Sequence, residues 1–124
     1  EEAGVLNSAL RKNKIEPVLL ASPTTSPARL RRIGKESGSI VYYVSREGVT
    51  GARRGLAAGL SARLKEVKAL TGKPLIVGFG VASRAQAQAL APLADGVVVG
   101  SALVAAGPRL GRLAHEIVEG LILC

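Results

Sequence analysis

The chain has 124 residues, enough for one small domain with a single hydrophobic core. Apolar residues make up 48% of it, mostly Ala, Val, Leu and Ile, which excludes a disordered chain and suits parallel strands covered by helices. Its apolar runs are too short to span a bilayer, and the N-terminus lacks the pattern of a signal peptide, so we expect a cytoplasmic protein without a membrane partner.

Seventeen Lys and Arg against nine acids give a net charge of +8, which could attract nucleic acid or smaller anions. The basic residues are spread over the predicted helices, and two Tyr and one Phe leave few rings on which bases could stack. We therefore interpret the basic residues as solvated helix faces and expect no nucleic-acid partner. A basic nucleic-acid-binding domain is kept as an alternative hypothesis. The lone Cys124 cannot form an internal disulfide.

The first half of the chain predicts two helices and two strands. Apolar spacing and basic residues near its end predict a helix over 1–14, followed by a short buried strand over 17–21. Ser26 is placed to cap a second helix, with Pro27 in its first turn and Leu30 and Ile33 facing a core. Gly38 is expected to end this helix, and the β-branched and aromatic residues of 40–44 predict the second strand.

The second half repeats the alternation. An apolar stripe of Leu60, Leu64 and Val67 predicts a helix that ends at Gly72, and a third strand follows over 75–80. Ser83 and Gln86 have the spacing of a capping box for the next helix, which presents Ala87 and Leu90. The fourth strand is predicted over 96–99 and a short helical turn from Gly100. The last helix is predicted from an apolar stripe made of Leu110, Leu113, Ile117 and Leu121.

This unbroken alternation predicts an α/β fold with a parallel sheet and right-handed crossovers. Four strands could form an open doubly wound sheet or half of an eight-stranded barrel, and the chemistry of the loops favours the barrel. Ligands of such folds lie at the carboxyl ends of the strands, where this chain has Gly51, Gly80, Gly100 and Ser101. Glycine lets the backbone approach a phosphate closely, amides at the start of the helix after Gly100 would point at it, and the Ser101 hydroxyl can donate to it. Walker-type and dinucleotide-binding motifs are absent from the sequence.

Three segments carry a resemblance to a known family: 42–53, with the pattern Y-x-x-S-R-x-G-V-T-G-A, then 77–81, with G-F-G, and 94–102. The chain resembles the C-terminal half of the tryptophan synthase α subunit and the related indole-glycerol-phosphate lyases. The likeness covers nearly the whole chain. It implies a (β/α)8 TIM-barrel family, with residues 1–124 forming one domain, a half-barrel of four parallel strands that correspond to the fifth to eighth strands of the barrel.

The resemblance also implies a function. The family cleaves indole-3-glycerol phosphate to indole and glyceraldehyde 3-phosphate in tryptophan biosynthesis and passes indole to a pyridoxal-phosphate β subunit. It implies neither a metal nor a cofactor for this chain itself. By motif, the phosphate-binding positions are Gly51, Gly80, Gly100 and Ser101. Tyr42 corresponds to the tyrosine beside the catalytic carboxylate, Thr50 helps to order the site within a mobile loop over 46–53, and Phe79 and Val98 correspond to the indole pocket.

Alternatives remain for two of these residues: Phe79 could be ordinary core, and Tyr42 a strand residue with its hydroxyl at the surface. The family keeps its acid–base pair, a Glu and an Asp, in an N-terminal half that this sequence does not contain. Glu47 is the one acid expected on the reactive edge, where we interpret it as solvated. We therefore expect the chain to be inactive alone and to pair with an N-terminal half or with itself. The alternative function is a non-catalytic phosphate-binding half-barrel that self-associates.

Overall fold

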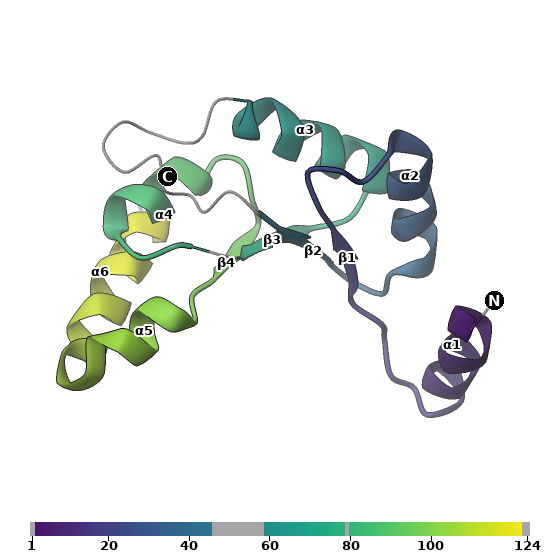
Figure 1. Ribbon diagram of the computed structural model, residues 1–124, viewed down its shortest axis with the longest axis horizontal. Coiled ribbons are helices and arrows are strands. Elements are labelled where there is room, and N and C mark those ends of the chain that lie inside the picture. Colours follow the sequence, from purple (N-terminus) through teal and green to yellow (C-terminus); the bar gives the residue numbers. More distant parts are fainter. Residues whose placement is uncertain (1, 46–58, 79, 123–124) are drawn as a thin grey trace.

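The computed structural model describes residues 2–45, 59–78 and 80–122, which form one parallel sheet and its covering helices (Figure 1). The strands are β1 (Leu19–Ala21), β2 (Val41–Val44), β3 (Leu75–Gly78) and β4 (Gly96–Val98). The helices are α1 (Glu2–Lys12), α2 (Pro27–Glu36), α3 (Leu60–Thr71), α4 (Arg84–Leu90), α5 (Ser101–Ala106) and α6 (Leu110–Ile122), and a 3-10 turn over Gly107–Arg109 joins the last two.

The sheet has the strand order β1-β2-β3-β4, so neighbours in the chain are neighbours in the sheet. All three pairs are parallel. A doubly wound sheet would reverse its strand order at a switch point, whereas a barrel adds strands in sequence around its wall. The order therefore confirms the prediction of a half-barrel.

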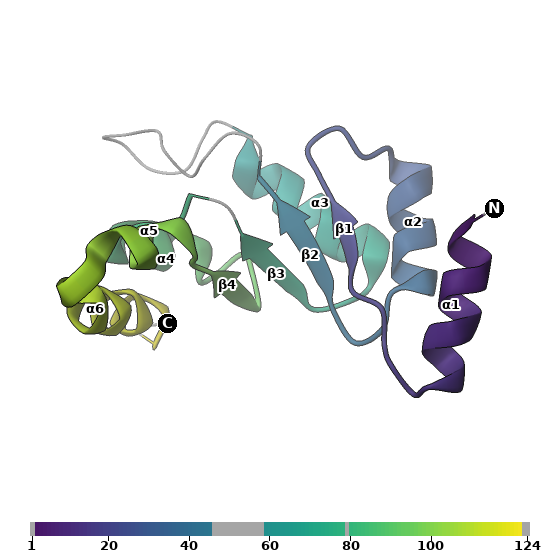
Figure 2. The same ribbon diagram turned by 60° about the horizontal axis from the view of Figure 1, so that its bottom comes forward.

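The two faces of the sheet differ in burial. Side chains that alternate toward the helices, such as Val41, Tyr43, Leu75 and Val77, are fully buried. The opposite face carries Leu20, which is 62% exposed, and in Figure 2 no helix of the described chain crosses in front of the strands. The face that would line the inside of a closed barrel is thus open in this chain.

Helices α2 and α3 pack against each other and supply much of the core. Predicted core residues Leu30, Leu64 and Val67 are fully buried, and Ile33 and Leu60 are nearly so. The predicted caps are present as well. Ser26 Oγ accepts from Arg29 N at 3.4 Å, and α3 ends at Gly72, whose φ of 61° is left-handed. At the β4 end of the sheet, α4 packs on α6 (Figure 1).

Several element boundaries differ from the predictions. The first strand begins at Leu19 rather than residue 17, because the Pro17 carbonyl accepts a hydrogen bond from Gly38 N, which is not part of the strand pairing. Likewise β2, β3 and β4 are each shorter than expected. Helix α2 ends through Ser37, whose backbone is extended, so Gly38 is not the cap that the sequence suggested. Gly38 is instead held close to Glu16, since a Cβ there would lie 2.5 Å from the Glu16 Cβ.

Two predicted apolar stripes are only partly buried. In α1, Val5 is 78% exposed and Ala9 is also exposed, so this helix does not bury its apolar residues in the core. In α6, Ile117 is buried as predicted, but Leu110 is 46% exposed. The two helices lie at opposite ends of the sheet (Figure 1), and α6 buries only the part of its stripe that packs on α4 and α5.

Candidate functional site

The carboxyl ends of the four strands meet at one edge of the sheet, because all strands run in the same direction (Figure 2). The described loop segments at this edge are 22–26 after β1, Ser45 after β2, 80–83 after β3 and 99–100 after β4. In the register of the sheet Val44 pairs with Gly78 and Gly78 with Val98. Predicted site residues from three strands therefore lie on the same edge.

Gly80 and Gly100 each stand two residues beyond the paired positions Gly78 and Val98. Gly80 has a φ of 82°, a conformation that other residues adopt only with strain. Gly100 is exposed and precedes α5, and Ser101 is the exposed first residue of that helix. Amides in the first turn of a helix have no acceptor within the helix, so this edge offers free N–H donors and one hydroxyl.

The loop after β3 is held by the hydrophobic core and by hydrogen bonds at the start of α4. Val81 is 2% exposed and forms part of the hydrophobic core. Ser83 Oγ accepts from Gln86 N at 3.4 Å, as the predicted capping box requires, and Gln86 Oε1 accepts from Ala82 N at 2.7 Å. These contacts hold the turn at Gly80 in place next to α4.

Tyr42 lies on the open face of the sheet with its side chain half-buried. Its hydroxyl and ring lie over Gly78, because a Cβ placed on Gly78 would collide with the Tyr42 Oη. Gly78 therefore provides the space that the tyrosine ring occupies. Val98, the neighbour of Gly78 on the other side, is 43% exposed, so Tyr42 and Val98 flank one patch of the open face.

Three predicted site residues, Thr50, Gly51 and Phe79, lie outside the described residues, as does Glu47. Their assignment to a mobile loop, a phosphate site and an indole pocket stays a prediction. The described residues that the structure brings to the same edge are Tyr42, Gly80, Val98, Gly100 and Ser101.

An arginine holds the loop after β1. Arg63 of α3 donates through Nη2 to the carbonyls of Ser22 and Thr25, at 3.2 and 2.5 Å, and through Nη1 to Glu66 Oε2 at 2.7 Å. Within the described chain, the buried Arg63 Nε has no acceptor. Sequence analysis missed this contact because the arginine and its loop are about 40 residues apart.

The titrating carboxylates with shifted pKa values lie at the other end of the sheet. The pKa of Asp95 is lowered, chiefly by the hydrogen bond that Lys68 Nζ donates at 2.8 Å and then by the amide of Leu75. The pKa of Glu16 is lowered by the hydroxyl and the amide of Ser39. Because they precede their strands, both groups fasten loops at the amino ends and do not face the candidate site.

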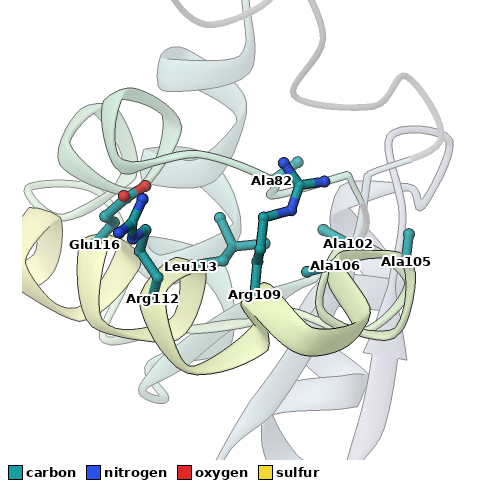
Figure 3. Close-up of a pocket in the computed structure, with 8 residues that line it drawn as sticks. All are labelled: Ala82, Ala102, Ala105, Ala106, Arg109, Arg112, Leu113 and Glu116. Carbon is teal, nitrogen blue, oxygen red and sulfur yellow. The ribbon is translucent and has the colours of Figure 1, made fainter.

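A cavity that sequence analysis also missed lies beside α5 and α6 (Figure 3). It has a volume of about 510 Å³ and is lined by Ala82, Ala102, Ala105, Ala106, Arg109, Arg112, Leu113 and Glu116. One signal could have found it. Arg109 stands at the beginning of a helix, where the dipole disfavours a positive charge, so its position suggests a role other than helix stability.

Comparisons with known proteins agree on one family. A family model described as tryptophan synthase alpha chain matches residues 1–119. The tryptophan synthase alpha chain of Gloeobacter violaceus is 44% identical over 122 residues, covering 93% of this chain and 44% of that protein. The alpha chain of Opitutus terrae is 39% identical over 104 residues, with 84% of this chain and 39% of the relative covered.

Solved structures give the same result. A tryptophan synthase structure from Mycobacterium tuberculosis matches with a TM-score of 0.84 and 39% identity, covering 99% of this chain and 48% of that one. The tryptophan synthase a2b2 complex of Pyrococcus furiosus matches with a TM-score of 0.82 and 33% identity, over 94% of this chain and 51% of the other. The chain thus spans about half the length of the relatives it matches. No helix in the described ranges has the length and apolar character to cross a membrane.

Proposed function

The chain belongs to the family of tryptophan synthase alpha chains, and on that premise we propose that it forms the phosphate-binding half of a lyase. The lyase cleaves indole-3-glycerol phosphate to indole and glyceraldehyde 3-phosphate. The observation that carries the proposal is the meeting of Gly80, Gly100 and Ser101 at the carboxyl edge of adjacent strands, where barrel enzymes bind phosphate.

In this proposal the phosphate of the substrate accepts hydrogen bonds from amides at Gly80, Gly100 and Ser101 and from the Ser101 hydroxyl, with Gly51 closing the cradle. A dianion held by several N–H donors fixes one end of the substrate, so the reacting bond is presented over the open face of the sheet. Val98 and Phe79 contact the indole ring there. Tyr42 stands beside the catalytic carboxylate, and Thr50 helps to order the catalytic site.

The reaction needs one proton delivered to C3 of indole and one removed from the glycerol hydroxyl, which is a task for two positioned carboxylates. The described loops at the carboxyl edge, 22–26, 80–83 and 99–100, contain no Asp or Glu. We therefore propose that the acid–base pair comes from an N-terminal half and that the chain alone does not turn over.

The open sheet supports pairing with further strands. Its inner face exposes Leu20 and Val98, and β1 and β4 are edge strands within the described sheet. Exposed apolar surface and unpaired strand edges favour association. We propose that an N-terminal half of the same family covers this face, with a second copy of the chain as the alternative. A β subunit is proposed to receive the indole, by analogy with the a2b2 complex of Pyrococcus furiosus.

The test is release of indole from indole-3-glycerol phosphate by the chain, by a separately expressed N-terminal half of a relative, and by the two mixed. We expect activity from the mixture alone, and its loss when Gly100→Asp places a carboxylate against the phosphate. Gly4→Asp adds the same carboxylate in α1, away from this edge, at a glycine whose Cβ would also meet no atom within 4 Å, so it serves as the matched control. An inert mixture whose halves associate would refute the lyase proposal.

The second candidate function is a non-catalytic phosphate-binding half-barrel that self-associates. The exposed inner face is the observation that favours it. The mass of the purified chain in light scattering, together with binding of glycerol 3-phosphate, separates the two candidates. A stable dimer that binds glycerol phosphate but yields no activity with any N-terminal half would favour the second.

A further inference from the structure

The cavity beside α5 and α6 has a floor of small side chains and a basic rim (Figure 3). Ala102, Ala105 and Ala106 of α5 leave it open, and Ala82 belongs to the loop after β3. Arg109 and Arg112 supply two positive charges, and Glu116 is the one acid among the lining residues of the described chain.

The two arginines differ in their surroundings. Figure 3 shows the Arg112 side chain next to that of Glu116, one turn further along the same helix. Arg109 instead extends away from α6 toward Ala82, so that its guanidinium lies over the alanine side of the cavity. No ion pair joins Arg109 to another residue in the part of the chain that the structure describes.

The loops after β3 and β4, which carry the candidate phosphate site, also lead directly to residues that line this cavity. Ala82 follows Gly80 by two residues in the loop after β3, and Ala102 directly follows Ser101. We propose that Arg109 binds the phosphate group of the substrate from the side of this cavity and adds a charged contact to the backbone donors. The inference rests on the proposed function, and it assigns phosphate binding to a residue outside the three segments that carry the family resemblance.

The chemistry favours a phosphate monoester as the ligand. At neutral pH such a group carries close to two negative charges and three acceptor oxygens, so amides from two loops leave acceptors for a guanidinium. Arginine binds phosphate oxygens in a bidentate geometry that lysine cannot reproduce. Alanine at positions 102, 105 and 106 keeps the space between Arg109 and the edge of the sheet free of larger side chains.

The experiment is isothermal titration of the 124-residue chain with glycerol 3-phosphate and with inorganic phosphate. Arg109→Ala is expected to weaken glycerol 3-phosphate binding about ten- to hundredfold, the usual effect of losing a hydrogen bond between charged groups. Arg109→Lys should recover only part of the affinity. Arg112→Ala removes the same charge three residues further along the chain, so it is the matched control and should change the affinity less than about twofold.

A second readout separates contact from a structural role. Between about pH 7.5 and pH 5 the phosphate loses most of its second charge, so the ratio of wild-type to Arg109→Ala affinity should fall. The melting temperature of each variant is measured beside it. If Arg109→Ala proves unstable, Arg109→Gln preserves most of the side-chain volume and carries the same prediction.

The outcomes separate this inference from the proposed function. If the wild-type chain binds glycerol 3-phosphate, Gly100→Asp abolishes binding and Arg109→Ala does not weaken it, the Arg109 contact is refuted while the phosphate site stands. Equal weakening by Arg109→Ala and Arg112→Ala would reduce the effect to net charge and also refute it. If wild type binds neither ligand, the phosphate site of the proposed function fails, and the Arg109 contact with it.

Discussion

The packing of α6 on α4 can be tested with two glycines of the same helix. A Cβ on Gly120 would lie 2.7 Å from the carbonyl oxygen of Arg84, where ordinary contacts begin at 3.4 Å, and a backbone atom cannot move aside alone. We expect the strain from overpacking in Gly120→Ala to cost about 1–3 kcal/mol. The gain in helix propensity, up to about 1 kcal/mol, offsets part of this cost. With the full offset, the expected net loss is about 0–2 kcal/mol.

Gly111 provides the opposite case, since a Cβ there meets no atom within 4 Å. Gly111→Ala should therefore stabilise the chain by up to about 1 kcal/mol, because only the propensity changes. Urea unfolding followed by circular dichroism gives both free energies, and an unchanged slope with denaturant shows that the unfolding transition is comparable. If Gly120→Ala is as stable as Gly111→Ala, the close approach of α6 to α4 does not limit the packing.

Three further changes test the core and the two ends of the sheet. Leu64→Ala, in a fully buried position, should lower the free energy of unfolding by about 2–5 kcal/mol, measured in urea. Arg63→Lys should cost about 1–2 kcal/mol and speed amide exchange in residues 22–26, because an ammonium cannot hold both loop carbonyls and Glu66. The interactions that lower the pKa of Asp95 stabilise the fold fully when the pH is above the ordinary pKa of 3.8. This stabilisation is lost as the pH falls through the lowered pKa of the folded state. Stability measured from neutral pH into this acid range should therefore fall less steeply in Asp95→Asn, and an unchanged slope would contradict the ion pair with Lys68.

Much of the fold could be predicted because its signals are local. Ser26 and Gly72 act as helix caps through hydrogen bonds and a backbone conformation within a few residues of each, so a short stretch of sequence is sufficient. The alternation of strands and helices likewise predicted a parallel sheet. Gly38 misled the prediction because a glycine can serve either a left-handed cap or a close approach, and only the position of Glu16 decides between them.

What could not be predicted depends on contacts between distant parts of the chain. Periodicity shows that α1 and α6 each have an apolar stripe, but it does not show what covers the stripe, and Val5 and Leu110 are exposed here. In the site, the motifs predicted Gly80, Gly100 and Ser101 because their loops follow strands directly. Arg109 was missed because it comes one helix later in the chain, and only the path of α5 and α6 brings it near Ala82.

The contacts of Asp95 stabilise the amino end of the sheet, whereas the candidate site lies at its carboxyl end. Its carboxylate joins α3 through Lys68 and β3 through the Leu75 amide, and its own amide donates back to the Leu75 carbonyl at 2.8 Å. Strands β3 and β4 are thereby pinned together before they reach the edge that holds Gly80 and Gly100. Substitutions in the loops at that edge can therefore change which ligand is recognised with little loss of fold stability.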